Sequence, residues 1–487
     1  MDLLLILIPV IASGLFWTTG SRKKLHIINV AGSLALLLAA AAVTIRLQNA
    51  GVITYSILNG FFYIDALNAL VLDITAVVSF LVSLYSVGYL NSEYPAAEDL
   101  KRIKLYYSLT SAFIFTMVLA ATTQNLGLLW IAIEATTLAS VFLVGFFNTK
   151  RSLEAAWKYI IICSVGIALA FLGIVFLYYS AHLIHNTESA LNWSFLSAQA
   201  GSLDSGVLKL AFIFILVGFG TKAGLAPMHT WLPDAHSEAP SPVSALLSGV
   251  LLNNAMYGIV RFMSIVNKNL GDSTYTGRLM IAFGLLSVGA SVLFILAQKD
   301  YKRTLAYSSI EHMGIISFAL GLFTPASLLA AFFHMFNHSL TKSMLFLCAG
   351  NVLHKFKSKE IISISGLFKA MPLTGGAFFL GILAIAGLPP FSIFASELNI
   401  IIAAFTSGHI AVGSVFTFQI AAAFAAIAYA LFRMFFGTPA ENHNHEDNPA
   451  GNAVILALLA AILITGFYLP PFLQTLFASA ARIVYGG

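Results

Sequence analysis

Two lysines lie where a membrane-type sequence rarely keeps a charge, within long apolar stretches. Lys222 and Lys342 are the two of the 25 lysines and arginines that fall inside such stretches, and the others lie in the gaps. An ammonium in hydrocarbon is costly, so this placement predicts a functional site. Other protonatable residues are similarly placed, at Asp73, Glu134, Glu311, Glu397, His312, His334 and His338. Groups of both signs in membrane segments indicate a path for protons or small cations.

Spacing brings some of these side chains together. His334, His338 and Lys342 follow one another at intervals of four, which places them on one face of a helix. Imidazoles titrate near neutrality and pass protons in both directions. A lone intramembrane histidine is more often a packing residue, but two beside a lysine favour a relay. His312, next to Glu311, fits the same line.

The elements that must position these residues are membrane helices. The chain has 59% hydrophobic and 9% charged residues, whereas soluble proteins average about 25% charged. A span needs about 20 apolar residues. The sequence predicts an all-α polytopic membrane protein with about fourteen helices, centred near residues 10, 36, 78, 113, 136, 169, 216, 253, 287, 312, 338, 388, 423 and 466. The first segment lacks a basic start and a cleavage site, so we expect it to remain in the mature protein.

Basic residues predict the orientation in the membrane. Lys and Arg gather in the loops after the odd-numbered predicted helices, among them residues 22–24, 101–102, 150–151, 302–303 and 355–359. Short cytoplasmic loops hold an excess of these residues. We therefore expect a multi-pass protein of the cytoplasmic (inner) membrane with both termini on the non-cytoplasmic side. The net charge of +5 reflects this bias and does not indicate a nucleic-acid partner.

Two matched Gly-Pro segments interrupt the apolar pattern. Residues 224–228 contain Pro227, and residues 387–391 contain Pro389 and Pro390. Proline removes a backbone donor and clashes with the preceding turn, so both helices are predicted to break there. Paired Pro-interrupted segments in two halves of a chain point to a transporter's ion site. A packing kink would explain one such break but explains two less well.

No metal or redox site is predicted. Cys163 and Cys348 are isolated in apolar runs and form no ligand cluster. The His443–Asp447 stretch is interpreted as a solvated linker, because short His-rich tracts are only compositional hints of metal binding. There is no Gly-rich nucleotide loop. We expect no cofactor on this chain.

Three segments resemble the antiporter-like subunits of respiratory complex I. They are residues 222–247 (KAGLAPMHTWLPDAHSEAPSPVSALL), residues 302–310 (KRTLAYSSI), and residues 387–391 (GLPPF) with Glu397. The resemblance covers roughly residues 60–435. It implies fourteen helices with two inverted five-helix repeats, at 104–264 and 277–436, between N-terminal helices at 1–103 and a linker with a last helix at 437–487.

Within this superfamily, residues 128–137 and 152–159 look most like the F-type subunit of hydrogenase 4 and related membrane nickel–iron hydrogenases. Quinone-reductase subunits of complex I are close neighbours. The resemblance implies a proton-translocating subunit of an oxidoreductase complex, whose redox chemistry belongs to a peripheral arm of iron–sulfur and, in a hydrogenase, nickel–iron subunits. Other membrane subunits and the lipid bilayer complete its partners. The chain ends soon after its last helix, without the lateral helix of the most distal complex I subunit, which argues against that position.

The resemblance also assigns roles to residues. Glu134 matches the acidic residue that pairs with the lysine of the first broken helix, here Lys222, and such a pair implies a switch because separation lets burial neutralise the lysine. A static ion pair is the alternative. Glu397 matches the terminal ionisable group near the outlet. Relatives often carry lysine or histidine where this chain has Asn253, which cannot titrate, so the central transfer is expected to depend on water.

Two other functions remain open from the sequence. One is a subunit of a cation/proton antiporter or of an inorganic-carbon uptake complex, which shares these motifs without redox chemistry. The other is a structural membrane anchor whose charged groups have lost transport. The transported ion, H⁺ or Na⁺, is not fixed by the sequence.

Overall fold

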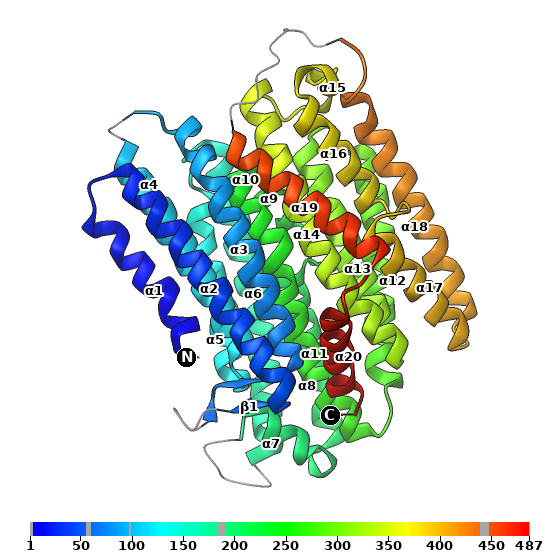
Figure 1. Cartoon of the computed structure of the whole chain (residues 1–487). Coiled ribbons are helices and arrows are strands. Elements are labelled where there is room, and N and C mark those ends of the chain that lie inside the picture. Colours follow the sequence, from blue (N-terminus) through cyan, green and yellow to red (C-terminus); the bar gives the residue numbers. More distant parts are fainter. Residues whose placement is uncertain (1–2, 55–59, 97–98, 183–189, 439–447, 487) are drawn as a thin grey trace.

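The computed structural model describes residues 3–54, 60–96, 99–182, 190–438 and 448–486. The predicted linker stretch His443–Asp447 lies outside these ranges. In the described part the chain is almost entirely helical, as predicted (Figure 1). Its one sheet there pairs β1 (Ile53–Thr54) with β2 (Tyr63–Ile64) in antiparallel register, with Ile53 opposite Ile64.

The first part of the chain forms α1 to α11. The helices are α1 (Leu3–Thr18), α2 (Arg22–Ala50), α3 (Ala66–Glu93), α4 (Leu100–Thr122), α5 (Leu126–Val144), α6 (Lys150–His182), α7 (Trp193–Ala198), α8 (Ser205–Ala223), α9 (Trp231–Glu238), α10 (Ser241–Leu246) and α11 (Leu252–Leu270). A π-helical segment, Leu247–Leu251, joins α10 to α11. A 3-10 turn, Ala200–Ser202, follows α7.

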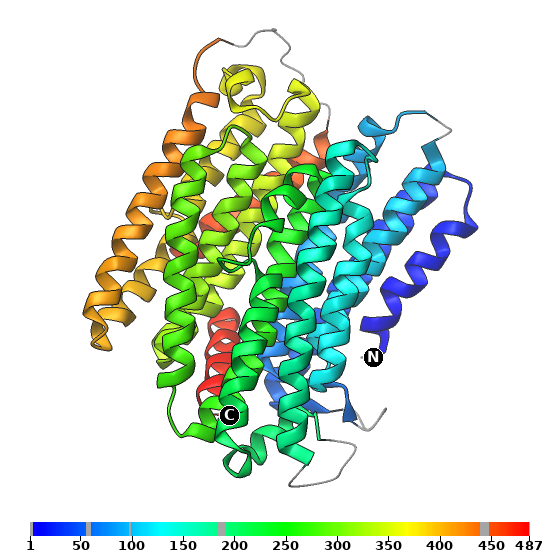
Figure 2. The same cartoon turned by 180° about the vertical axis from the view of Figure 1, so that it is seen from behind.

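The second part forms α12 to α20. These helices are α12 (Thr274–Ala297), α13 (Tyr301–Leu322), α14 (Pro325–Phe356), α15 (Leu367–Ala370), α16 (Pro372–Ile385), α17 (Ser392–Thr406), α18 (Ile410–Leu431), α19 (Pro449–Phe467) and α20 (Pro471–Gly486). Short 3-10 turns lie at Ile361–Ser363 and Phe432–Met434. From behind, α6, α8 and α12 cover the face opposite α2 and α19 (Figure 2).

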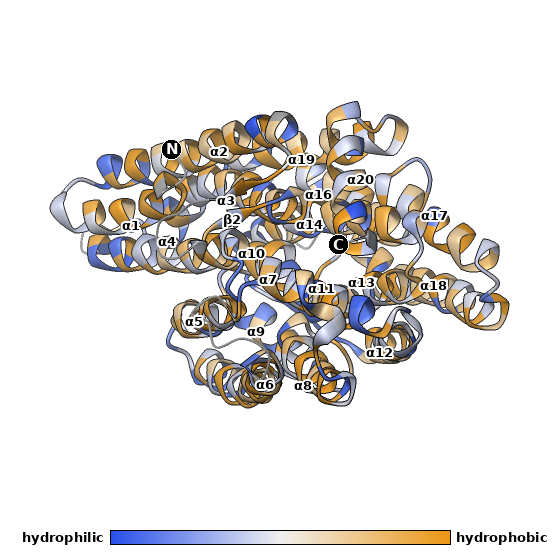
Figure 3. Cartoon of the chain, turned by 90° about the horizontal axis from the view of Figure 1, so that it is seen from below, coloured by the Kyte–Doolittle hydropathy of each residue, from blue (hydrophilic) through white to orange (hydrophobic). Residues whose placement is uncertain are grey.

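The helices are long and apolar enough for a polytopic membrane protein. Within the described residues, 11 helices qualify as membrane spans by length and composition, and Leu4–Thr18, Pro372–Ile385 and Ser392–Thr406 are shorter apolar helices. Seen from below, hydrophobic residues cover most of the outward helix faces (Figure 3). Such an outer surface suits a lipid environment.

Polar residues before the helices fix several of their starts. Asp65 accepts hydrogen bonds from the backbone N–H groups of Leu67 and Asn68 and so caps α3. Asn125 caps α5, and Asp300 caps α13. These caps satisfy N–H groups that have no partner inside a helix. They set where the polar side chains of each helix lie along the bundle.

Both predicted helix breaks are present in the structure. The first runs from Gly224 to Thr230 between α8 and α9, and the second from Ala386 to Phe391 between α16 and α17. Gly224 and Gly387 turn the chain with φ of 79° and 70°, a conformation that favours glycine. Each break frees a backbone carbonyl near the centre of the bundle.

The last predicted helix, centred near residue 466, is placed differently by the structure. There α19 ends at Phe467, and α20 begins at Pro471 after Pro470. Consecutive prolines cannot continue the hydrogen-bond ladder of a helix, so the apolar run is divided. The sequence prediction missed this break because it followed hydropathy alone.

Candidate functional site

The first station of the site is Lys222, in the last turn of α8 beside the break. Its side chain is fully buried. The Nζ atom donates to the Thr137 hydroxyl and to the Tyr159 hydroxyl, each at 2.7 Å. It also lies 4.7 Å from the centre of the Tyr159 ring, which favours a cation. Neutral oxygen atoms and an aromatic ring therefore hold this lysine.

Glu134 and Lys222 do not form the direct pair expected from the sequence. Thr137 lies between them, since its hydroxyl, which accepts from Lys222, is 3.3 Å from the Glu134 Oε2 atom. The Ser164 hydroxyl donates to the other carboxylate oxygen at 2.9 Å. Glu134 is half-buried on α5. A hydroxyl that accepts on one side and donates on the other can pass a proton between the two groups.

The centre of the site is Asn253, at the start of α11. Its Nδ2 atom donates to the Ser339 hydroxyl of α14 at 2.7 Å, while its Oδ1 atom is buried without a partner. The π-helical segment directly precedes it, and such segments are frequent at functional sites. A buried acceptor without a protein partner suits a water molecule, as the predicted water-dependent transfer requires.

The second station is Lys342, on α14. Its Nζ atom donates to the Leu305 carbonyl at 2.7 Å and to the Ser308 hydroxyl. Like Lys222 it is fully buried, and within the described residues its hydrogen-bond partners are neutral oxygen atoms. Glu311 has one carboxylate oxygen without a partner, and both ring nitrogens of His338 have none. Ring centres of His338 and His312 are 5.4 Å apart.

His312 and His334 form a hydrogen-bonded chain between α13 and α14. The His312 Nδ1 and His334 Nε2 atoms are 2.9 Å apart. His312 Nε2 faces the Ile385 carbonyl, freed by the second break, at 3.0 Å. His334 Nδ1 lies 2.9 Å from the Ser396 hydroxyl. All four ring nitrogens therefore have partners.

The hydrogen-bonded series formed by His312, His334 and Ser396 can hold one extra proton. A carbonyl only accepts, so His312 Nε2 must carry a hydrogen, and one more lies between the two rings. If Ser396 donates to His334, both imidazoles are neutral. If Ser396 instead donates to the Ile393 carbonyl, 2.8 Å away, His334 donates to Ser396 and the pair carries one added proton. Rotation of one hydroxyl switches between these arrangements.

Glu397, on α17, completes the line at the second break. It is 4% exposed, and a Cβ placed on Gly387 would lie 2.1 Å from its Oε2 atom. A larger residue at this position would displace the carboxylate from where it lies in the structure. Donor atoms of His312, His334 and Glu397 lie within 4.8 Å of one another. Each of the four nitrogen atoms of His312 and His334 also has a hydrogen-bond partner in the structure.

Two buried cations were missed by the sequence analysis. Arg261, 2% exposed in α11, forms an ion pair with Asp65 at 2.7 Å. Lys302, fully buried at the start of α13, donates to the Ala239 carbonyl at 2.8 Å. The prediction that membrane segments contain cations only at Lys222 and Lys342 is therefore wrong. Both missed residues were assigned to segment ends, where long side chains usually reach water.

A signal for Arg261 was present in the sequence. Asn253, Tyr257 and Arg261 recur at intervals of four and so share one face of α11. Tyr257 accepts from Arg261 Nε at 3.2 Å. The line leads from the centre of the bundle to the end that holds β1 and α7 (Figure 1).

Asp73, the other acidic residue predicted in a membrane segment, is half-buried. Its carboxylate accepts a hydrogen bond from the Thr44 hydroxyl at 2.8 Å.

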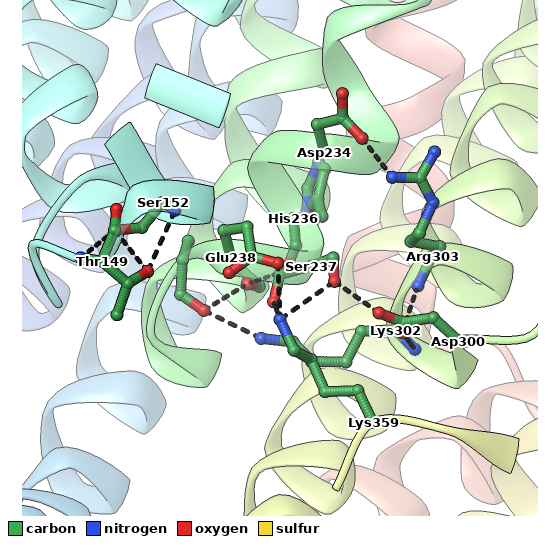
Figure 4. A network of polar contacts seen from close by, with 12 residues as sticks. Thr149, Ser152, Asp234, His236, Ser237, Glu238, Asp300, Lys302, Arg303 and Lys359 are labelled. Atoms are coloured by element: carbon green, nitrogen blue, oxygen red, sulfur yellow. Dashed lines mark hydrogen bonds and ion pairs between the residues drawn. The ribbon is translucent and has the colours of Figure 1, made fainter. Parts of the chain in front are cut away.

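Towards the opposite end of the bundle, charged residues of α9 and of the start of α13 form a second network, which Figure 4 shows from close by. Asp234 of α9 pairs with Arg303 of α13 and, at 3.2 Å, with Lys158 of α6. Glu238 pairs with Lys359 at 2.7 Å. These contacts tie α9, the half-helix after the first break, to α6, to the start of α13 and to the segment that follows α14.

The fold and this interior define a class of protein: a polytopic helical membrane protein whose two broken helices flank a buried line of titratable side chains. Comparisons with known proteins identify the family. The family of NADH:quinone oxidoreductase/Mrp antiporter membrane subunits matches residues 123–424, and the N-terminal family of complex I chain 5 matches residues 57–97. The chain belongs to this family and is an antiporter-like membrane subunit.

Individual relatives agree with this assignment. The chain is 39% identical over 416 residues to the hydrogenase-4 component F homolog of Methylacidiphilum infernorum, covering 84% of this chain and 86% of the relative. A chain of the membrane-bound sulfane sulfur reductase, an archaeal respiratory membrane complex, superposes with a TM-score of 0.89 at 26% identity, over 99% and 97% of the two chains. A chain of the Mrp complex from Dietzia sp. DQ12-45-1b gives 0.88 at 21% identity over the same shares and shows the fold alone.

Proposed function

We propose that this chain moves protons across a membrane as one subunit of a redox-driven complex of the hydrogenase 4 or NADH:quinone oxidoreductase kind. The path runs from Glu134 and Lys222 through water at Asn253 to the second station. There the proton passes through the cluster of His312, His334, His338 and Lys342 to the outlet residue Glu397. Pro227, Pro389 and Pro390 break the helices that carry the two ends of the path.

One observation carries this proposal: Lys222 and Lys342 are fully buried and are held by hydroxyl and carbonyl groups. A lysine in such surroundings can lose its proton without leaving a buried carboxylate uncompensated. The partnerless atoms of Asn253 and His338 leave places for water between the stations. The pair of His312 and His334 can take up and release one proton.

The proposed architecture extends the observed fold. The eleven candidate spans, together with α1, α14 and the broken pair α16 and α17, make fourteen crossings. We infer two inverted repeats at 104–264 and 277–436. In support, three long helices precede the interrupted one in each range: α4, α5 and α6 come before α8, and α12, α13 and α14 come before α16.

Orientation, location and partners complete the proposal. Arg22, Lys150, Arg303 and Lys355 lie in or beside loops at one end of the bundle, which supports a cytoplasmic position for that end and a non-cytoplasmic position for both termini. We assign the chain to the cytoplasmic (inner) membrane, among other membrane subunits. A peripheral arm with iron–sulfur subunits supplies the redox energy, and this chain carries no cofactor.

A second candidate is a cation/proton antiporter or inorganic-carbon uptake complex without redox chemistry. Its specific support is the family description, which names the Mrp antiporter beside the quinone oxidoreductase. The same buried line would serve either assembly, because both need a proton path within the membrane.

Purification of the native complex in gentle detergent, with mass spectrometric identification of every co-purifying subunit, separates the two candidates. We expect a large hydrogenase-type or NADH-binding subunit together with iron–sulfur proteins. A complex of small membrane subunits alone, or with a soluble carbon-handling protein, would remove the redox proposal and favour the second candidate.

Proton flux into vesicles that contain the complex tests translocation itself. Lys342→Met keeps the volume of the side chain but removes the exchangeable proton. We expect the assembled Lys342→Met complex to lose driven proton flux, with Lys299→Met, an exposed lysine, as the matched control. Normal flux in the assembled Lys342→Met complex would leave a structural anchor as the function.

A further inference from the structure

A polar cavity lies between α3, α14 and α19, away from the path described above. Its lining includes Tyr85 and Ser92 of α3, Gly350 and His354 of α14, and Asn452 of α19. Its volume of about 40 Å³ is enough for about three water molecules. Ser92 and His354 are partly exposed and form its mouth. The mouth lies at the end of the bundle where the basic loops gather.

The floor of the cavity is formed at Gly350. A Cβ added there would lie 2.6 Å from the Tyr85 hydroxyl and 2.8 Å from the Ser241 Cβ, so glycine is needed for both side chains to approach α14. Tyr85 is fixed by donation to the Leu347 carbonyl at 2.9 Å. Ser241 is fully buried, and in the part of the chain that the structure describes its hydroxyl has no hydrogen-bond partner. An unpartnered buried hydroxyl on the far side of the floor is a place for water.

His236 continues the line beyond this floor. It is fully buried on α9, beside the charged network of Figure 4, and among the described residues neither ring nitrogen has a hydrogen-bond partner of good geometry. Its ring stacks on Phe346 of α14 at 5.2 Å between centres. A buried imidazole without any hydrogen bond is unusual unless water or a proton carrier reaches it.

The order of these residues along α14 leads to the second station. Lys342, Phe346 and Gly350 recur at intervals of four and therefore share one face. Each interval advances about 6 Å along the helix. The cavity floor is thus about 12 Å from Lys342, and His236 lies against the residue between them.

We propose that this cavity is a second inlet, which brings protons from the basic side directly to Lys342 by way of water at Ser241 and His236. In the transfer, a hydronium in the cavity gives a proton to one nitrogen of His236. The other nitrogen releases its proton through water to the neutral Lys342 amine, which becomes an ammonium. His236 is neutral before and after the step. The inference rests on the proposed function, because it adds a supply to the same relay.

Blocking the cavity by a thiol reagent tests the inlet in the assembled complex. Ser92→Cys places a reactive thiol at the mouth, and the native Cys163 and Cys348 are fully buried and should not react. After modification with a bulky, charged methanethiosulfonate, we expect driven proton flux to fall severalfold. Asn91→Cys, on the exposed side of α3 and outside the cavity lining, should be modified without loss of flux.

A second variant probes the hydrated path without relying on turnover. Ser241→Cys introduces a thiol at a fully buried position beyond the floor. We expect a small methanethiosulfonate to label it, as measured by mass, and we expect this labelling to slow when the mouth is blocked in a double variant with Ser92→Cys. An introduced thiol as unreactive as Cys348 would overturn the inlet.

Comparison with Lys342→Met separates the two proposals. If the blocked Ser92→Cys complex keeps full flux while the Lys342→Met complex has none, the inlet is wrong and the relay stands. If the Lys342→Met complex also keeps full flux, the relay itself is wrong.

Discussion

Two arginines near the ends of the bundle lie beside carboxylates, whereas the two lysines in its middle lie beside neutral oxygen atoms. Arg261 pairs with Asp65 at one end, and Arg303 with Asp234 at the other. Lys222 is held by two hydroxyls, and Lys342 by a carbonyl and a hydroxyl. The Arg261–Asp65 pair is buried, and a buried ion pair strongly resists the loss of either charge, while the Arg303–Asp234 pair is partly exposed. A lysine held by neutral groups resists it much less, so the ends suit structure and the middle suits proton exchange.

The largest expected effect is on Lys222 itself. Lys222→Ala removes the amine that takes up and releases the proton at the first station, and a positioned proton donor typically contributes about 100-fold or more to the rate. We expect driven proton flux in vesicles to fall by at least about 100-fold while the complex still assembles. Lys299→Ala, on an exposed lysine, is the control. If the Lys222→Ala complex keeps its proton flux, the buried lysine stabilises the fold, as the ion pairs at the ends do, and does not carry protons.

Substitution of Arg261 should lower the stability of the complex and leave its proton flux nearly unchanged. Arg261→Gln leaves the Asp65 carboxylate buried without its partner, and breaking such a pair costs about 3–5 kcal/mol. We expect the free energy of unfolding of the purified complex to fall by about that amount, seen as a lower unfolding temperature. Flux per assembled complex should change little. Arg278→Gln, on the surface, is the matched variant. If the Arg261→Gln complex is stable but fails to move protons, Arg261 takes part in transport and its assignment to a structural role is wrong.

A smaller effect on proton flux is expected for the Thr137 hydroxyl, which lies between Glu134 and Lys222. Thr137→Val keeps the shape of the side chain but removes the hydroxyl between Glu134 and Lys222, and loss of a hydrogen bond to a buried charge costs about 1–3 kcal/mol. We expect flux to slow by about tenfold. Thr137→Ser should retain most of the activity, because its hydroxyl can take the same place. Equal rates in both variants would show that the bridge is not used.

The smallest effect belongs to the exposed pairs. Lys158 contacts Glu154 at 2.7 Å and Asp234 at 3.2 Å, but its side chain is 48% exposed. Surface pairs contribute about 0.2–1 kcal/mol. Lys158→Gln should therefore leave both the unfolding temperature and the flux close to wild type. A large loss of flux here would indicate that the charged end takes part in transport.

Much of the fold follows from local features of the sequence. Glycine and proline at residues 224–228 and 387–391 act on the backbone where they occur, so the breaks could be predicted. The shared face of His334, His338 and Lys342 follows from helical geometry alone. In the structure all three are buried on α14.

The partners of the site residues could not be predicted in this way. Thr137, Tyr159 and Ser396 are ordinary membrane-helix residues by type, and their contacts with Lys222 and His334 arise only when distant helices pack. Arg261 was missed for a related reason. Its carboxylate partner, Asp65, lies 196 positions earlier in the chain, so the sequence around either residue does not predict the ion pair.

The π-helical segment before Asn253 has a consequence for how this helix tolerates length changes. A π turn holds one residue more than an α turn. Removing one residue from Leu247–Leu251 would replace the wide turn by a regular α turn and leave the parts on either side near their present orientation, because the wide turn already absorbs the extra residue. A deletion within the regular part of α11, between Asn253 and Arg261, would instead rotate Arg261 by about 100° relative to Asn253 and turn it away from Asp65. The π-helical segment is therefore the place where this helix can lose one residue and keep both of its halves facing their present neighbours.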